Sequence, residues 1–455
     1  MTHPFLDQIL AALSDSGNEP DRPAIMVKGS GGLPAWFDVT GLAVDSFAAA
    51  GLAIARLSAL QGNKALRIAI DRRHASRWFG FAIRPIGWEM PPAWDAIAGD
   101  YRTADGWIRL HTNAAHHRAA ALRVLETIAE PGHVATAVGQ WQADDLEAAI
   151  VAAGGCAAAM RDMHAWQHHR HGAQVAREPL IAWKNQGKTR PLVLTGPASR
   201  PLQGIKVLDL TRVLAGPVAG RFLAAYGADV LRIDPPEWEE DSIVPEMTLG
   251  KRCAGLDLNQ ADARVQFEHL LRQADILLNG YRADALARLG YDEQAIRRIN
   301  PSLIDVRLNA YGWTGPWQNR RGFDSLVQMS SGIADFGMRL SKSGRPTPLP
   351  VQALDMATGY LLAAAAGHAI YERVTSGTAL SARLSLARTA HLLAASKRCD
   401  IGEPLPPETS DEQDPTIENT AWGQARRIRF PLTIAGAPHR WEHPASKLRS
   451  SPASW

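Results

Sequence analysis

From residue 205 onward, short apolar runs alternate with amphipathic stretches, and this alternation predicts a parallel sheet. Two apolar strands, Ile205–Leu210 and Asp229–Asp234, flank an amphipathic helix at Val218–Tyr226. Strand, helix and strand within about 30 residues are typical of a βαβ unit. The alternation of helix and strand continues at residues 261–273, 275–278, 293–299 and 303–308. We therefore predict an α/β fold with a doubly wound, Rossmann-like sheet in this half of the chain.

The N-terminal half has a different pattern, which predicts a smaller α/β domain at residues 91–185. Asp100–Leu110 has two alternating stretches around an Asp-Gly pair, which is a hairpin signal. Helical periodicity follows at residues 116–128 and 143–153. The next stretch, 186–200, is rich in Pro, Gly, Lys and Thr, so we interpret it as a linker.

A segment near residue 38 is repeated near residue 355. Leu33-Pro-Ala-Trp-Phe-Asp-Val-Thr-Gly41 is similar to Leu349-Pro-Val-Gln-Ala-Leu-Asp-Met-Ala-Thr-Gly359 once small gaps are allowed. Each copy places one carboxylate, Asp38 or Asp355, just before Thr-Gly and an Ala-rich helix. The first helix is expected at residues 44–60, with a strand at 66–70. Chance likeness of Ala-rich helices is the alternative to a partial gene duplication.

Composition and charge exclude several classes of protein. The chain has 455 residues, enough for two or three domains, and a net charge of only +3, which indicates neither a nucleic-acid nor a membrane partner. Cys156, Cys253 and Cys399 lie far apart, as expected in a reducing cytoplasm. We find no secretory signal and no apolar run of membrane-spanning length. The His-rich stretch 164–171 has no supporting carboxylate or cysteine, so no metal site is predicted.

The strand ends carry no dinucleotide or P-loop signature. Neither Gly-x-Gly-x-x-Gly nor Gly-x-x-x-x-Gly-Lys-Ser/Thr follows the first strand at Ile205–Leu210. A dinucleotide cofactor is therefore not indicated.

Six motifs between residues 201 and 391 carry a family resemblance. They begin with Pro-Leu-Gln-Gly-Ile-Lys-Val-Leu-Asp-Leu-Thr-Arg-Val-Leu-Ala-Gly-Pro and continue at residues 226–236, 250–258, 285–304, 321–324 and around Asp355. In this order they resemble the class III CoA-transferases, the family of formyl-CoA and carnitine-CoA transferases and the related 2-methylacyl-CoA racemases. Coenzyme A would then be a substrate, and no further cofactor is expected.

The resemblance also suggests a rearranged order of domains. Residues 91–185 are similar to the small domain of the family, which normally follows the catalytic Asp segment. We therefore divide the chain as follows: 1–90, a partial duplicate of the Asp-bearing half; 91–185, the small domain; 186–200, the linker; 201–395, the CoA-binding domain with its Asp segment; and 396–455, a tail that wraps over another domain. The resemblance further implies a homodimer.

Chemistry supports an aspartate as the nucleophile of such an enzyme. A carboxylate can attack a thioester carbonyl, release CoA thiolate and form a mixed anhydride, and then become an acyl-CoA itself. Asp355 is the predicted nucleophile, and Asp38 is a doubtful second copy. Backbone N–H groups near Thr358 and Gly359 are candidate oxyanion donors. The alternative for both aspartates is a helix N-cap, which needs no chemistry.

The resemblance assigns CoA binding to loops after the strands and to basic residues. These residues are Arg212, Val213, Leu214, Ala215, Lys251, Arg252, Asn279 and Arg288. Charge-assisted hydrogen bonds to the phosphates and the adenine edge are their expected task. A solvated surface charge is the alternative for each of the basic residues.

Two other functions stay open at this stage. A racemase of this family typically has His where the chain has Phe323, and Phe cannot move an α-proton, so racemisation is disfavoured. A catalytically inactive CoA-thioester-binding relative is the second alternative. It is motivated by the domain order and by Ala353-Leu354 before Asp355, where the family usually has Gly. The acids that react are not predicted by any motif.

Overall fold

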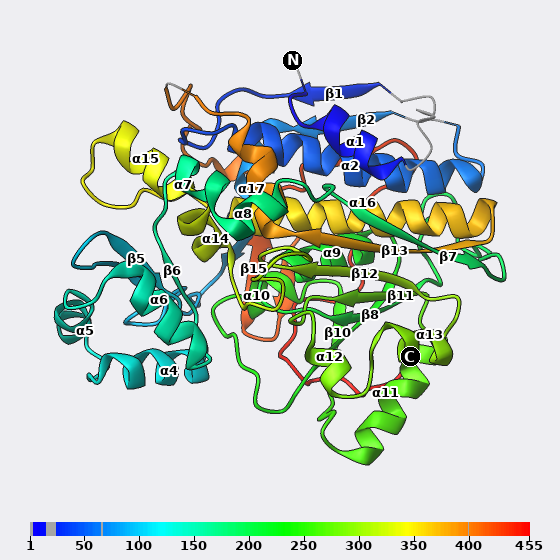
Figure 1. Cartoon of the computed structure of the whole chain (residues 1–455). Coiled ribbons are helices and arrows are strands. Elements are labelled where there is room, and N and C mark those ends of the chain that lie inside the picture. Colours follow the sequence, from blue (N-terminus) through cyan, green and yellow to red (C-terminus); the bar gives the residue numbers. More distant parts are fainter. Residues whose placement is uncertain (1–2, 15–23, 65–66, 399) are drawn as a thin grey trace.

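A seven-stranded sheet forms the centre of the molecule, and its strand order is β10-β9-β8-β11-β12-β13-β7 (Figure 1). The computed structural model describes residues 3–14, 24–64, 67–398 and 400–455. The strands are β7 (Ala182–Lys188), β8 (Lys206–Leu210), β9 (Asp229–Asp234), β10 (Lys251–Gly255), β11 (Ile276–Asn279), β12 (Ile304–Asn309) and β13 (Thr378–Ser385). From β8 the chain builds the sheet outward to β10, returns to β11 beside β8, and builds in the other direction. This order is that of a doubly wound Rossmann-like sheet, as predicted.

Apolar side chains of the strands alternate between two cores, as expected for a parallel sheet covered on both faces. On β8, Val207 belongs to the core shared with helices α9 (Ala215–Ala225) and α16 (Ala353–Thr375). Its neighbour Leu208 belongs to the core shared with α11 (Ala261–Gln273). The helices therefore sandwich the sheet.

The small domain has its own sheet and its own core (Figure 1). Its strands are β4 (Gly99–Arg102), β5 (Trp107–Leu110) and β6 (Ala157–Ala159), and its helices are α4 (Ala115–Leu125), α5 (Pro131–Val138) and α6 (Ala143–Ala152). The predicted hairpin is confirmed, with Asp100 opposite Arg109 in antiparallel strands. Helix α4 ends earlier than expected because Glu126 adopts a left-handed conformation with φ of 48°.

The two Asp segments have the same order of elements and lie against each other. Strand β1 (Ile25–Lys28), helix α2 (Val39–Leu60), parallel strand β2 (Ile68–Asp71) and helix α3 (Arg72–Trp78) correspond to β12, α16, β13 and α17 (Leu386–Ala394). Figure 1 shows α2 along α16. The Phe47 and Tyr360 ring centroids are 3.9 Å apart, and a Cβ on Gly367 would lie 2.8 Å from that of Ala53. Helix α2 starts at residue 39, five residues before its predicted start.

Helix α2 corrects our expectation that no segment is long enough to span a membrane. Among the described residues, the helix Val39–Leu60 is long and apolar enough to span a membrane, judged by length and composition alone. However, 89% of its most apolar window is buried inside the protein. Asp45 and Arg56 interrupt the apolar run in the sequence, so no continuous apolar stretch of this length marks the helix. Such burial is that of a core helix.

The first residues of the predicted linker lie in the large sheet, and the predicted tail contributes strands to two small sheets. β7 extends to Lys188 and pairs antiparallel with β13, so the stretch 186–200 begins inside a strand. The strand was missed because it is a mostly polar edge strand. In the tail, β16 (Leu432–Ile434) pairs with β2, while β14 (Glu418–Thr420) and β15 (Gly423–Arg427) join β3 (Ile83–Pro85). The chain then crosses to the large sheet, where Ser451 N–H donates to Cys253 O at 2.7 Å.

Short helices complete the fold. They are α1 (Leu6–Leu13), α7 (Met163–His168), α8 (Arg170–Val175), α10 (Val244–Met247), α12 (Ala285–Arg288), α13 (Glu293–Ile299), α14 (Asp324–Ser330), α15 (Ile333–Ser341) and the 3₁₀ turn Ser410–Glu412. Cys156 and Cys253 are free and buried, and Cys399 lies outside the described residues.

Candidate functional site

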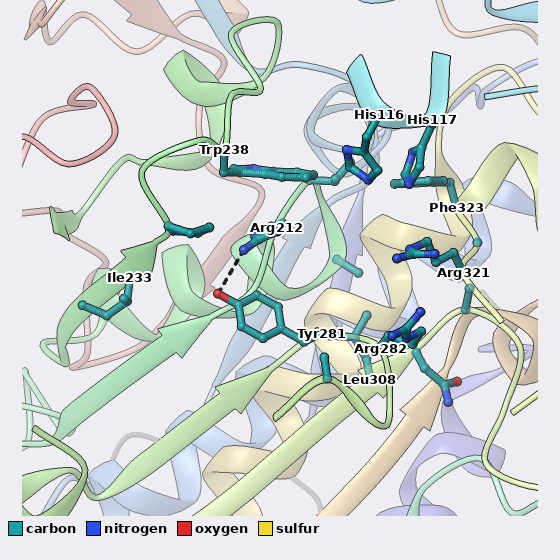
Figure 2. Close-up of a pocket in the computed structure, with 18 of the residues that line it drawn as sticks. His116, His117, Arg212, Ile233, Trp238, Tyr281, Arg282, Leu308, Arg321 and Phe323 are labelled. Atoms are coloured by element: carbon teal, nitrogen blue, oxygen red, sulfur yellow. Dashed lines mark hydrogen bonds between the residues drawn. The ribbon is translucent and has the colours of Figure 1, made fainter. Parts of the chain in front are cut away.

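A cavity of about 460 Å³ opens at the carboxyl ends of β8 and β11, where the strand order reverses. Arg212 and Val213 follow β8, and Tyr281 follows β11. Doubly wound sheets bind their ligands at this switch point. Asp355 from α16 contributes to the lining, and the small domain covers another side of the cavity. The cavity therefore collects residues from both domains (Figure 2).

Asp355 lies in the first turn of α16 and is 7% exposed. The N-cap position belongs to Gln352, whose side chain makes no capping hydrogen bond. The N-cap alternative is therefore wrong for Asp355, and its carboxyl group is not used to begin the helix.

Asp324 takes over the capping task from a neighbouring helix. It is the last residue of the Arg-Gly-Phe-Asp motif and the first of α14. One carboxylate oxygen accepts from the backbone N–H of Asp355 at 2.8 Å, and the Leu354 N–H also donates to this carboxylate. The other oxygen accepts from Gln328 Nε2 at 2.5 Å. Asp324 thus fixes the start of α16 and the position of Asp355 from outside that helix.

The pKa of Asp355 is raised by burial and by the neighbouring carboxyl group of Asp324. Burial raises the pKa of Asp355 well above its usual range, and the negative charge of Asp324 raises it further. Burial also raises the pKa of Asp324. A carboxylate held with little solvation is a better nucleophile once ionised, but it ionises at higher pH than an exposed one.

The loop after β8 is strained at the cavity wall. Val213 has a φ of 64°, which is unfavourable for a β-branched residue, and its N–H donates to Glu240 Oε2 at 3.0 Å. The Arg212 guanidinium lies 4.2 Å from the Trp238 ring centroid and 4.6 Å from that of Tyr281. Its Nη2 donates to the Tyr281 hydroxyl at 3.3 Å (Figure 2). Planar groups thus stack at the mouth of the cavity.

The structure brings three of the eight predicted CoA-binding residues to the cavity, namely Arg212, Val213 and Ala215. Leu214 is buried behind them at 5% exposure and is not among the lining residues. The backbone loop therefore lies where the sequence predicts it.

The other predicted CoA-binding residues are engaged elsewhere. All four lie outside the lining of the cavity. Lys251 donates to Asp209 Oδ2 at 2.8 Å, and Arg252 donates to Asp229 Oδ2 at 2.8 Å. Asn279 accepts from the Tyr281 N–H at 3.0 Å, and Arg288 pairs with Asp284 at 2.7 Å on the surface. The fully buried pair of Lys251 with Asp209 contradicts the surface-charge alternative for Lys251. Only Arg288 matches that alternative closely, since its side chain is 69% exposed.

Sequence reasoning missed several lining residues, including Trp238, Tyr281, His116, His117 and Arg321. Tyr281 comes directly after the end of β11, so its position after a strand was an available signal, and Arg321 stands in the quoted Arg-Gly-Phe-Asp motif. The histidines come from the small domain, and no spacing in the sequence relates them to Asp355.

Asp38 occupies a different site. It caps α2 by accepting from the Gly41 N–H at 2.8 Å, and it pairs with Arg398 at 2.6 Å. It faces a separate cavity of about 240 Å³, which Arg72 also lines. The N-cap interpretation is confirmed for Asp38, and the two aspartates do not share a cavity.

These features define an α/β protein with a buried acidic group at the ligand-binding edge of a doubly wound sheet. Residues 202–427 match the family model described as CoA-transferase family III. This region of the chain belongs to that family, as the motifs predicted.

Known relatives are similar over about half of their length. A probable fatty acyl-CoA transferase, Rv3272 of Mycobacterium tuberculosis, is 34% identical over 199 residues, which are 41% of this chain and 50% of the relative. A succinate–glutarate CoA-transferase of Agrobacterium fabrum is 32% identical over 196 residues, 39% of this chain and 48% of the relative. A crystal structure of Rv3272 is 34% identical and covers 43% of this chain and 56% of that one, with a TM-score of 0.41.

Proposed function

We propose that the protein transfers CoA from an acyl-CoA to a carboxylic acid, with Asp355 as the nucleophile. The observation that carries the proposal is a buried Asp355 at the switch-point cavity of a family III region. Relatives of this region are named CoA-transferases, with substrates as different as fatty acyl groups and succinate.

The proposed reaction needs no group beyond the two substrates and the protein. An Asp355 oxygen attacks the thioester carbonyl, the carbon–sulfur bond breaks, and CoA leaves as the thiolate. The thiolate then attacks the Asp355 carbonyl of the mixed anhydride, which releases the first acid and forms an aspartyl-CoA thioester. The acceptor carboxylate repeats the two steps in reverse and leaves as the new acyl-CoA, so Asp355 is regenerated.

The residues around Asp355 have defined tasks in this scheme. Asp324 holds the start of α16, and Gly359 lets α16 approach α9 closely, since a Cβ there would lie 2.5 Å from Ala215 O. The Thr358 and Gly359 N–H groups are inside the second turn of α16 and bond to the preceding turn, so they are not the oxyanion donors we expected. The small domain contributes His116 and His117 to the wall of the cavity.

The test is CoA transfer by matched aspartate variants. Purified D355A is expected to lose transfer from an acyl-CoA to an acid, and D38A is expected to keep it, because Asp38 faces another cavity. Hydroxylamine added during turnover should convert Asp355 of the wild type into a protein-bound hydroxamate, which D355A cannot form. Full transfer by D355A would refute the proposal.

Two outcomes would support the other functions instead. A protein that binds acyl-CoA without transfer or adduct is the inactive relative. Deuterium exchange at the α-carbon would indicate racemisation, which Phe323 disfavours. The homodimer and the cytoplasmic location remain predictions that a sedimentation experiment and cell fractionation would test.

A further inference from the structure

Glu240 joins two parts of the cavity wall, although it is not one of the residues that line the cavity. It lies in the segment after β9, and its side chain is 6% exposed. Its Oε2 accepts two hydrogen bonds, from the Val213 N–H at 3.0 Å and from Trp238 Nε1 at 2.9 Å. Val213 and Trp238 both line the cavity. One carboxylate oxygen therefore holds the loop after β8 and an aromatic ring at the mouth together.

The other oxygen of Glu240 is fixed by a buried ion pair. Oε1 pairs with Arg232 Nη2, and Arg232 is anchored in turn to Asp234, with 2.8 Å between Nε and Oδ2. Arg232 and Asp234 are both in β9 and fully buried. A buried carboxylate that is bonded at both oxygens is held in one geometry. The position of the Glu240 acceptor oxygen is therefore set by a strand of the large sheet.

Val213 needs such a partner because its backbone is strained. Its φ of 64° lies in the left-handed region, where β-branched residues are rarely found. A conformation of this kind persists only where the surroundings impose it. The hydrogen bond from the Val213 N–H to Glu240 contributes to this, since hydrogen bonds to a charged acceptor are among the strongest in proteins.

Trp238 extends the same arrangement to Arg212. The Arg212 guanidinium lies 4.2 Å from the Trp238 ring centroid and 4.6 Å from that of Tyr281, and Figure 2 shows it between the two rings. The indole that Glu240 holds therefore keeps a cation in place beside Val213. Both residues of the loop, Arg212 and Val213, depend on this one carboxylate.

We propose that Glu240 is a positioning residue for the binding of acyl-CoA: it keeps loop 212–215 and Trp238 in the arrangement that receives the CoA portion. The inference rests on the proposed function, which names the ligand. Glu240 lies outside the lining of the cavity, so it acts through Val213 and Trp238 and not on the reacting atoms. Its loss should weaken CoA binding, while bound CoA restores the loop and the reaction at Asp355.

Calorimetric titration with CoA measures this role without turnover. E240A should raise the Kd for CoA by about 10- to 100-fold, the change expected when a hydrogen bond to a charged group is lost. E240Q keeps an oxygen acceptor and should stay within about fivefold of the wild type, because a neutral amide accepts a weaker hydrogen bond. E239A is the matched control and should leave the Kd unchanged, since the neighbouring Glu239 is 59% exposed and pairs with Arg449 outside the cavity lining.

Replacing Val213 with glycine separates positioning from general stability. Glycine adopts positive φ without steric cost, so the loop depends less on Glu240. In a double-mutant cycle, the loss of CoA affinity caused by E240A should be several-fold smaller in V213G than in the wild type. An equal loss in both backgrounds would overturn the proposal, because Glu240 would then not act through Val213. If E240A does not fold in urea-unfolding controls, E240Q replaces it in the cycle, and its smaller loss should vanish in V213G.

Steady-state kinetics give a second readout. E240A should raise KM for the acyl-CoA by about 10- to 100-fold while kcat falls less than about threefold, the pattern of lost substrate binding. The kcat/KM for the acid should change less than about threefold, because the acid reacts after CoA is attached to Asp355. A fall in kcat with unchanged KM for the acyl-CoA would contradict the positioning role.

The two proposals fail in different ways. Transfer that depends on Asp355, with equal CoA affinity in the wild type and E240A, refutes the role of Glu240 alone. Absence of transfer with every acid refutes the proposed function, and the CoA titrations of E240A and V213G still decide the role of Glu240.

Discussion

Replacing Gly359 with alanine tests how closely α16 must lie on α9. A Cβ at this position would be 2.5 Å from Ala215 O and 2.7 Å from Val218 Cβ. Favourable carbon–carbon separations are about 3.5–4.0 Å, so the helices must separate by roughly 1 Å. Overpacking of this kind costs about 1–3 kcal/mol, and the better helix propensity of alanine returns up to about 1 kcal/mol. We expect G359A to lose about 1–2 kcal/mol of stability.

The same displacement should affect the reaction, since Ala215 and Asp355 line one cavity. A misplacement of about 1 Å is expected to lower kcat by roughly 10- to 100-fold. Urea unfolding and CoA-transfer rates measure the two effects. G132A is the matched control, because Gly132 lies in helix α5 with no atom within 4 Å of the added Cβ, and it should be neutral or stabilising. A G359A protein as stable and active as the wild type would show that the close approach has no role.

Three further substitutions test the charges around the site. D324N removes the negative charge that helps to raise the pKa of Asp355, so the acid limb of the kcat/KM profile should move to lower pH; an unmoved limb contradicts this cause. In the folded protein the raised pKa of Asp355 means that ionisation of this group is destabilising. D355N removes the group, so the melting temperature of the variant should exceed that of the wild type near neutral pH. The difference should shrink toward acidic pH, where Asp355 is protonated in both the folded and the unfolded state. K251M leaves Asp209 buried without its partner and should cost about 3–5 kcal/mol; a loss of CoA affinity at unchanged stability would restore the predicted CoA role of Lys251.

Much of the fold could be predicted because its strands are buried on both faces. Continuous apolar runs such as 205–210 leave little choice but a central parallel strand, and the Asp-Gly pair in 100–110 specifies a hairpin. β7 gave no such signal, because an edge strand with polar, partly exposed side chains has the composition of a linker. The start of α2 was misplaced because Thr40 and Gly41 are weak helix formers, and here they are held by packing.

The parts of the candidate site that follow from local sequence and strand order could be predicted. The parts that depend on contacts between residues far apart in the sequence could not. The position of 212–215 follows from strand topology, since the loop after the first strand reaches the switch point. The sequence motif contains Lys251 but does not show that its side chain points inward to Asp209. His117 reaches the cavity only because the small domain docks there, which no local pattern encodes.

The packing of α2 on α16 has a consequence for how the fold responds to dilution. Both helices belong to one chain, so each α16 has its own α2 to cover its apolar side. The effective concentration of α2 near α16 is set by the chain that joins them. A cover supplied by a separate subunit would be lost as the protein is diluted, by mass action. Here the contact that buries Tyr360 and Phe47 is as strong at nanomolar as at millimolar protein. The N-terminal segment that contains α2 therefore acts as a tethered partner for the helix that carries Asp355.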